Sequence, residues 1–203
     1  MKSFNYKKAV QILNFFAKEA GGSINYMKAL KLIYLSDRLH LRYYGRPITS
    51  DQYYAMKFGP VPSATYDIAK DNYKDIDQNQ SDYRYNYIQT NETDRFKIDS
   101  VGSLELEFFS KSDLNEMSNI FEEFGHMSQF QLSELTHIFP EWTMHEEELK
   151  IDGTLHVPMD YKNFFLDPDS SKNPRIFALQ DEDILEVALE SFHRYNFRRP
   201  QYA

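Results

Sequence analysis

The sequence predicts an α+β fold that is predominantly α-helical, in which a helical core surrounds a central buried helix and carries a small antiparallel β-sheet. Apolar residues recur at helical spacing in several segments, and one segment is apolar on two opposite faces. Short aromatic or alternating stretches lie between turn residues and indicate a few strands. The chain has 203 residues, of which 41% are hydrophobic, so it can form one core of ordinary size.

The first helix is predicted over residues 4–20. Its apolar positions recur every three or four residues, and Gly21 and Gly22 follow as a stop signal. The positions that carry the pattern are Ala9, Ile12, Leu13, Phe16 and Ala20.

A second helix is predicted to start after Ser23 or Asn25, either of which can cap it, and to end at about Tyr44, before Gly45 and Pro47. On a helical wheel it is apolar on two opposite sides, with a narrow basic stripe between them, so we expect neighbours on both sides. The first side holds Leu30, Ile33, Tyr34, Asp37, Leu41 and Tyr44, the opposite side Leu32, Leu35 and Leu39, and the stripe Lys31, Arg38 and Arg42.

The next segment combines a strand, a turn and a helix. Residues 50–58 are rich in aromatic side chains and predict a short strand. The sequence FGPVP at 58–62 predicts a rigid turn, because a glycine and two prolines restrict the backbone. Pro62 suits the first position of a third helix over about 62–72.

The middle of the chain is predicted to be the least regular part. Residues 71–84 are polar without a periodic pattern and predict a loop. Residues 85–99 predict two strands about a turn near Asn91–Asp94, and residues 104–108 alternate like a third strand.

The remainder is predicted to be helical. Ser112 is expected to cap a helix that ends at Gly125, and Ser128 with Gln131 forms a capping box for the next helix. After Pro140, residues 141–150 predict a short helix, and a looser proline-containing segment leads to a last helix over about 181–196. The tail that follows is expected to be frayed.

Asp37 is a carboxylate in the middle of an apolar helix face. A buried, ionised carboxylate without partners is very unfavourable, so it needs hydrogen-bond donors, a cation or a proton. It acts either as a catalytic acid or binding anchor, or as a clamp that ties this helix to another element; we favour the clamp. The donors that we expect for it are Tyr34, Tyr44, Arg46, Lys57, His137 and Trp142.

Motifs for catalysis, cofactors or metals are absent from the sequence. The chain has no cysteine, which excludes disulfides, thiolate metal sites and a cysteine nucleophile. HExxH, GxGxxG, the P-loop and GxSxG do not occur, and His137 and His145 near Glu146–Glu148 have no established metal-ligand spacing. We therefore predict no catalytic residues, no cofactor and no metal site.

The net charge of −8 makes nucleic acid a poor partner, because an acidic surface repels phosphate backbones. The same charge would favour a basic protein partner, or it simply keeps the protein soluble, and charge alone does not decide between the two. Apolar runs stay well short of the roughly 18–20 residues that span a bilayer. The first residues do not resemble a secretion signal. We expect a cytoplasmic protein that binds neither nucleic acid nor membrane.

Two segments resemble the Panacea-domain, or SocA-like, antitoxin family. KALKLIYLSDRLHLRYYGRPI and AMKFGPVPSATY, within residues 28–66, are similar to the family's lysine–leucine helix, GRPL-type turn and KYGPVxPxxY stretch, with Phe58 in place of the usual tyrosine. LSELTHIFPEW at 132–142 resembles a second family segment. The matching residues are Lys31, Leu32, Tyr34, Asp37, His40, Gly45, Arg46, Pro47, Lys57, Gly59, Pro60, Val61, Pro62, Tyr66, Leu132, Ser133, Thr136, His137 and Trp142.

The resemblance implies a Panacea domain over residues 1–150, with 151–203 as a C-terminal extension that packs on the same domain. It implies a non-enzymatic antitoxin that neutralises the protein toxin of a toxin–antitoxin system by direct binding. Some relatives act instead as adaptors that deliver the toxin to an ATP-dependent protease, and others are carried by phages or prophages. A metal-dependent hydrolase that uses Asp37 or His137 is the weakest alternative.

We expect the motif residues to act mainly in the fold. Lys57 and FGPVP then form a fold-defining corner, and His137 forms a core pair with Trp142, its imidazole hydrogen-bonded internally. The basic stripe of the second helix either meets an acidic partner or pairs with Glu146–Glu148, and we favour the pairing. The structural set is Tyr34, Asp37, His40, Gly45, Lys57, Gly59, Pro60, Val61, His137 and Trp142. Loops tend to carry partner specificity, so the candidates for partner binding are Tyr73, Tyr83, Tyr85 and Tyr87.

Overall fold

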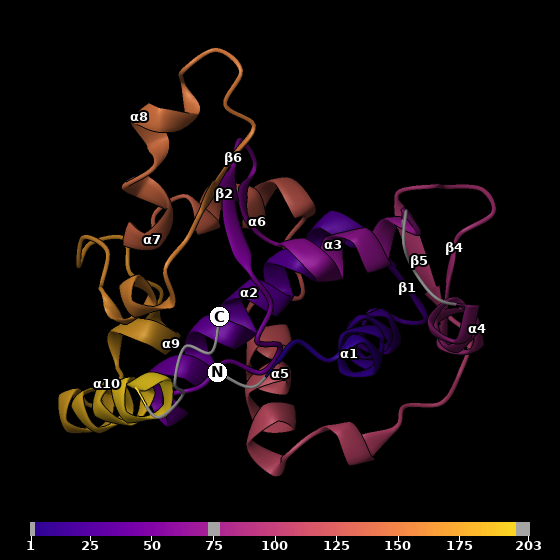
Figure 1. The fold of residues 1–203 in the computed structure, drawn as a ribbon, viewed down its shortest axis with the longest axis horizontal. Helices are drawn as coiled ribbons and strands as arrows, with labels where there is room; N and C mark the ends of the chain where they lie inside the picture. The colour runs from indigo at the N-terminus through magenta and orange to yellow at the C-terminus, as the bar shows by residue number, and fades with distance from the viewer. Residues whose placement is uncertain (1–2, 73–77, 198–203) are drawn as a thin grey trace.

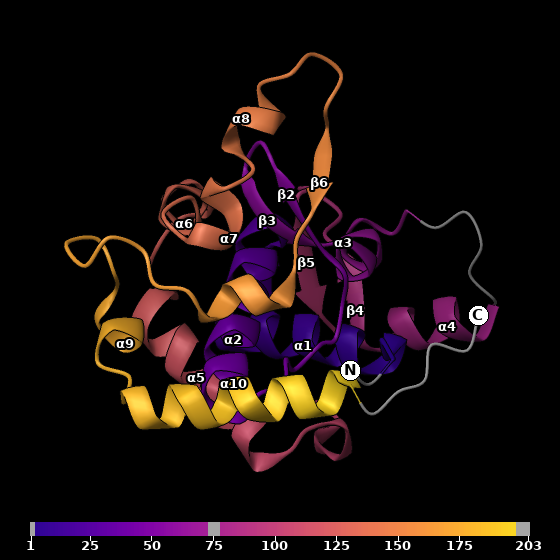
Figure 2. The same cartoon turned by 60° about the vertical axis from the view of Figure 1, so that its left-hand side comes forward.

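The computed structural model describes residues 3–72 and 78–197 and confirms a predominantly helical α+β fold (Figures 1 and 2). Helix α2 (Tyr26–Tyr44) is central and contacts α1, α5, α6 and α10. Every residue of α2 from Ala29 to Arg42 is buried, as its two apolar faces predict. The other helices of the described residues are α1 (Tyr6–Glu19), α3 (Ser63–Lys70), α4 (Gln78–Tyr87), α5 (Lys111–Phe124), α6 (Gln129–Thr136), α7 (Pro140–Thr143), α8 (Glu146–Leu149), α9 (Arg175–Ala178) and α10 (Glu182–Phe197), with 3₁₀ turns η1 (Leu106–Phe108) and η2 (Tyr161–Phe165).

Local capping defines the ends of the first two helices. Asn5 caps α1 by accepting from the backbone N–H of Lys8. Asn25, one of the two predicted candidates, caps α2, and Gly45 ends α2 in the left-handed conformation with φ 67°. Ser23 lies in a strand instead.

The described residues form two small antiparallel sheets. One has the order β1–β5–β4, built from β1 (Ser23–Asn25), β4 (Ile88–Thr90) and β5 (Lys97–Ser100). The other has the order β3–β2–β6, built from β2 (Tyr53–Met56), β3 (Gly59–Pro62) and β6 (His156–Pro158). The predicted strand at 104–108 is wrong, because three of its residues form the 3₁₀ turn η1.

The predicted rigid turn at FGPVP is also wrong in its position. Met56 pairs with Gly59, so the two-residue turn is Lys57–Phe58, and the GPVP stretch is strand β3. Strand β3 tolerates its two prolines because it is an edge strand, where a missing N–H needs no partner on the open side. Pro62 is the N-cap residue of α3 rather than its first helical residue.

Two helical predictions need correction. The predicted loop 71–84 contains the start of α4, whose polar sequence gives no apolar stripe. The fold holds α4 instead through Arg84, which is fully buried and donates to the carbonyl oxygen of Ile68 at 2.9 Å. Ser110, not Ser112, caps α5, and its capping box uses Asp113.

The chain after Thr143 returns to the central helix. The predicted helix at 141–150 consists of the two short helices α7 and α8, and β6 follows where no strand was predicted. Phe165, Phe177 and Phe192 are buried in the common core, and α10 packs along α2. The predicted frayed tail from residue 198 lies outside the described residues.

Candidate functional site

Asp37 holds the segment that follows α2 against the helix. Its Oδ1 accepts from the backbone N–H groups of Ile48, at 2.7 Å, and Thr49, at 3.0 Å. Its Oδ2 accepts from the hydroxyls of Thr49 and Tyr53. The side chain is fully buried, and this burial raises the pKa of Asp37 against the opposing effect of its hydrogen bonds. Each oxygen of the Asp37 carboxylate therefore accepts two hydrogen bonds from within the protein.

The donors predicted for Asp37 are wrong. The chain turns back after Gly45, which brings backbone N–H groups 11 and 12 positions away to the carboxylate. The predicted donors have other partners. Tyr34 donates to Glu141 at 2.6 Å, and the indole of Trp142 donates to the carbonyl oxygen of Met56 at 2.9 Å. Arg46 contacts Asp113 and Tyr44 contacts Glu116, while Lys57 lies at the hairpin turn beside Phe58 and His137 stacks on Trp142.

The segment after α2 carries a buried carboxylate of its own, Asp51, which the sequence reading missed. It accepts from the N–H groups of Ala64 and Thr65 and from the Thr65 hydroxyl, at 2.7–3.0 Å. It thereby caps α3 from a distance, since Pro62 has no side-chain acceptor. Ser50 lies between the two carboxylates with φ 55°, a left-handed conformation that is uncommon for serine. The sequence did contain a signal for this remote cap: the third helix starts directly after a proline, which has no side chain that could cap it.

The basic stripe of α2 is buried and paired with groups other than the predicted Glu146–Glu148. The Nε atom of Arg38 lies 2.9 Å from Oε1 of Glu141, and both side chains are buried. Arg42 donates to the carbonyl oxygen of Phe165 at 2.7 Å and pairs with Asp167 at 2.9 Å. Two of these three partners come from the segment after residue 160, so this segment satisfies the charge of the central helix.

The two family-like segments meet around the β2–β3 hairpin. Lys31 donates to the carbonyl oxygen of Pro60 at 2.8 Å, and burial lowers the pKa of Lys31 to about 7. Gly59 has φ 95°, and a Cβ atom there would lie 2.5 Å from Oγ1 of Thr136 and 2.9 Å from Nζ of Lys31. The motif glycine therefore allows the hairpin to approach α2 and α6 closely.

His137 and Trp142 also contact this hairpin: Cδ2 of His137 would lie 3.4 Å from a Cβ atom at Gly59, and the indole of Trp142 donates to the carbonyl oxygen of Met56. Their rings stack with centroids 3.9 Å apart. Within the described part of the chain, the buried Nε2 atom of His137 has no hydrogen-bond partner, so stacking rather than the expected internal hydrogen bond holds the ring. Burial, and secondarily the nearby Lys31, lowers the pKa of His137. Val61 pairs with Tyr54 in the hairpin itself.

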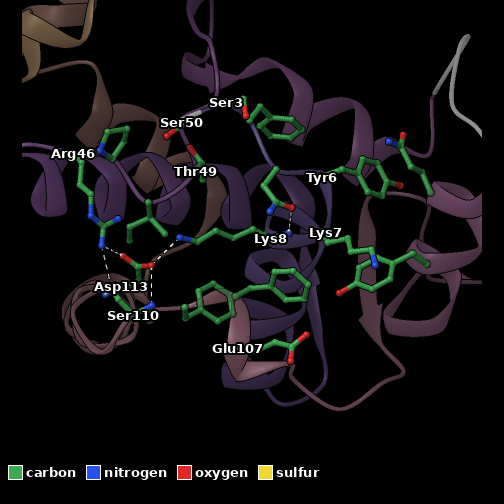
Figure 3. A pocket seen from close by; sticks show the side chains of 18 of the residues that line it. Ser3, Tyr6, Lys7, Lys8, Arg46, Thr49, Ser50, Glu107, Ser110 and Asp113 are labelled. Atoms are coloured by element: carbon green, nitrogen blue, oxygen red, sulfur yellow. Dashed lines mark hydrogen bonds and ion pairs between the residues drawn. The ribbon is translucent and has the colours of Figure 1, made fainter. Parts of the chain in front are cut away.

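A cleft of about 960 Å³ lies on another side of α2 (Figure 3). It is bordered by the start of α1, residues 46–50, part of α4 with Tyr83, η1 and the start of α5. Asp113 at its wall lies 2.7 Å from Nζ of Lys8, 2.9 Å from Arg46 and 3.1 Å from His40. Burial opposes ionisation, but hydrogen bonds from His40 and Lys8 outweigh it and hold the pKa of Asp113 well below its usual range. Asp113 thus joins α1, α2 and α5.

The tyrosines predicted for partner binding have different environments. The hydroxyls of Tyr83 and Tyr87 both donate to Glu105, which ties α4 to the segment before η1. Tyr85 is 44% exposed and donates to Asp71 at 2.6 Å. Tyr73 lies outside the described residues.

Two further properties of the described residues bear on function. Within residues 3–72 and 78–197, no group of three or more His, Asp or Glu side chains is arranged to hold a metal ion. None of the helices in these ranges combines the length and apolar character needed to cross a lipid bilayer.

Comparison with known protein families matches residues 30–143 to the family described as Antitoxin SocA-like, Panacea domain. The match covers more than half of the chain, from within α2 to the end of α7, and it includes both predicted segments from Leu30 onward. Searches of curated proteins and of solved structures found no match. The buried contacts of Lys31, Asp37 and Gly59 and the stacking of His137 on Trp142 lie within the matched region, and the chain belongs to the SocA-like antitoxin family through its Panacea domain.

Proposed function

We propose that this protein is an antitoxin that neutralises a protein toxin by binding it directly and without catalysis. The family match over residues 30–143 carries the proposal. The net charge of −8 supports it, because an acidic surface speeds the encounter with a basic protein. We place the interaction in the cytoplasm, in agreement with a chain that has no cysteine.

The motif residues support binding rather than catalysis. A catalytic carboxylate has to reach its substrate, whereas Asp37 is fully buried and its two oxygens accept four hydrogen bonds. Lys31 and Glu141 are buried in the same way, and each is bonded to another part of the chain. These groups hold the scaffold, so we propose that its exposed surface contacts the partner.

Co-expression with the protein encoded next to its gene tests the proposal. We expect the neighbouring protein to stop growth when expressed alone, and growth to recover when this chain is present. The two proteins should then co-purify as one complex. A neighbour that is harmless alone, or that still stops growth beside this chain, contradicts the proposal.

Toxin turnover separates direct neutralisation from delivery to a protease. In direct neutralisation, the half-life of the toxin stays the same or lengthens when this chain is present, because the complex shields the toxin. Delivery instead predicts a shorter half-life that depends on an ATP-dependent protease. Rescue of growth that disappears in a strain without such proteases would replace our proposal with the adaptor role.

A further inference from the structure

Four large apolar side chains are exposed at one end of the molecule, which we call the apex. They come from the β2–β3 turn, the start of α6 and the segment between α8 and β6. Figures 1 and 2 agree that the β2–β3 turn and the α8–β6 segment extend away from the body together. The four are Phe58 (56% exposed), Phe130 (62%), Ile151 (62%) and Leu155 (74%).

A hydrogen bond joins the hairpin turn that carries Phe58 to α6, the helix that carries Phe130. The hydroxyl of Ser133 donates to the carbonyl oxygen of Phe58 at 2.9 Å, which fixes the turn against α6. Phe130 precedes Ser133 by three residues, so the two side chains share one face of α6. Phe130 therefore lies one helical turn before the residue that binds the backbone of Phe58.

Strand pairing places Leu155 at the same end of the sheet, and a turn connects Ile151 to it. Met56 pairs with His156, and the antiparallel register continued by one residue places Leu155 beside Lys57. The backbone N–H of Thr154 donates to the carbonyl oxygen of Ile151 at 3.0 Å, which closes the turn before the strand. The four apolar residues therefore lie on segments that are bonded to one another around the end of the sheet.

The segments that carry the apex, residues 57–58, 129–136 and 145–155, are mainly acidic. Their exposed carboxylates are Glu134, Glu146, Glu147, Glu148 and Asp152. Their ammonium groups are Lys57 and Lys150, and Lys150 is paired with Glu146 at 3.4 Å and Glu147 at 2.7 Å. A partner that covers the apex gains most when it presents an apolar patch with lysine or arginine around it.

We propose that the apex is the surface that docks the toxin, and that the toxin presents there an apolar patch flanked by basic side chains. This inference rests on the proposed antitoxin function. Exposed apolar side chains that cluster beside one another typically mark interaction sites, whereas scattered ones do not. Pro158 in the edge strand β6 lacks an N–H, so docking uses side chains of the apex rather than an added strand.

Binding to the purified protein encoded by the adjacent gene tests the apex. The double variant Phe58→Ser with Leu155→Ser removes two apolar anchors, and we expect its Kd to rise by roughly tenfold or more. The matched control is Leu179→Ser with Val187→Ser, whose side chains are 69% and 67% exposed elsewhere, and its Kd should stay within about twofold of the wild type. Tyr85→Ser, which probes the region around α4, should behave like this control.

Charge reversal tests the chemistry of the partner without removing apolar surface. In the variant Glu134→Lys with Glu148→Lys, we expect association to slow by roughly tenfold at low salt, and the difference from wild type to shrink at high salt. The control reversal, Glu122→Lys with Glu186→Lys, lies on α5 and α10, away from the apex. It should slow association clearly less, and an equal effect from both pairs would contradict a basic patch facing the apex.

The outcomes distinguish this inference from the function on which it rests. If the wild-type chain does not bind the neighbouring protein, the antitoxin proposal and the apex fail together. If the wild-type chain binds and the apolar apex variant binds equally well, only the apex is wrong. A wild-type dimer that the apex variant converts to a monomer would show that a second copy covers this surface, which also overturns the inference. Circular dichroism checks that each variant keeps its fold.

Discussion

Asp37 organises the segment after α2, so its removal should affect stability rather than chemistry. In Asp37→Ala, the buried N–H groups of Ile48 and Thr49 and the buried hydroxyls lose their acceptor. Each unsatisfied buried donor costs about 1–3 kcal/mol, so we expect at least that loss in the free energy of unfolding. Urea denaturation measures it, with the exposed Glu123→Ala as control. Unchanged stability with lost toxin binding would instead make Asp37 a contact residue.

The burial of Asp37 could be predicted from the sequence, but its partners could not. The helical wheel reports which side chains share a face of α2, and that placement is correct. Two of the donors are backbone N–H groups and two are hydroxyls, and all four lie on a segment whose return path depends on Gly45 and on the β2–β3 hairpin. Side-chain patterns carry no information on such a path, so donors from other segments were expected instead.

Lys31 should make stability depend on pH above neutrality. Its pKa is about 7 in the folded state, against 10.5 as the ordinary value, because burial disfavours the ammonium form. Between these values the unfolded chain holds a proton that the folded chain has released, so the free energy of unfolding rises with pH, by at most about 1.4 kcal/mol per unit. Urea denaturation from pH 7 to pH 9 should show this rise, and Lys31→Met should remove most of it. Equal slopes for both proteins would contradict a buried ammonium with a lowered pKa.

At the scale of elements, Gly45 couples the end of α2 to α10. It has φ 67°, and a Cβ atom there would lie 2.5 Å from the carbonyl oxygen of Ala188 and 2.8 Å from Cβ of Ser191. Gly45→Ala therefore adds a steric overlap with backbone to the strain of a left-handed residue, and we expect α10 to be displaced.

Gly21→Ala is the matched control for Gly45→Ala. Gly21 has φ 85°, but nothing lies within 4 Å of the position that its Cβ would occupy. The free energy of unfolding of Gly21→Ala should fall by only the roughly 1–2 kcal/mol that a left-handed alanine costs. The free energy of unfolding of Gly45→Ala should fall by clearly more. Thermal melts of both variants measure the difference. Equal losses of stability in the two variants would show that α10 can move away from Gly45 at no energetic cost.

Elements that contain their own signals could be predicted, and elements that depend on distant contacts could not. Apolar spacing and caps located α1 and α2 to within about two residues. Helix α4 has no apolar stripe and is held by Arg84 and by the Tyr83 and Tyr87 bonds to Glu105. Strand β6 has three residues and exists through its pairing with β2. The hairpin turn was misplaced because proline, read as a turn signal, lies here in an edge strand.

At the scale of the whole molecule, residues beyond the end of the family match pack directly against the matched region. Residues 30–143 match, yet Arg38 and Arg42 of the matched region donate to the carbonyl oxygens of Leu166 and Phe165. Gln180 also donates to the carbonyl oxygen of Arg42 at 2.6 Å. We therefore propose that the described residues after 150, 151–197, and the Panacea domain form one folding unit.

One folding unit predicts one unfolding transition. Trp142, the only tryptophan, reports on the contact between α7 and the β2–β3 hairpin, whereas far-UV circular dichroism reports on all helices, including α10. Both probes should give the same midpoint in urea. A chain that stops at Pro158 should not fold, because it leaves the buried guanidinium groups of Arg38 and Arg42 without their carbonyl partners and uncovers Phe139, which packs against Phe177. Two separated midpoints, or a truncated chain that still unfolds cooperatively, would show instead that the C-terminal segment is a separate unit resting on a complete domain.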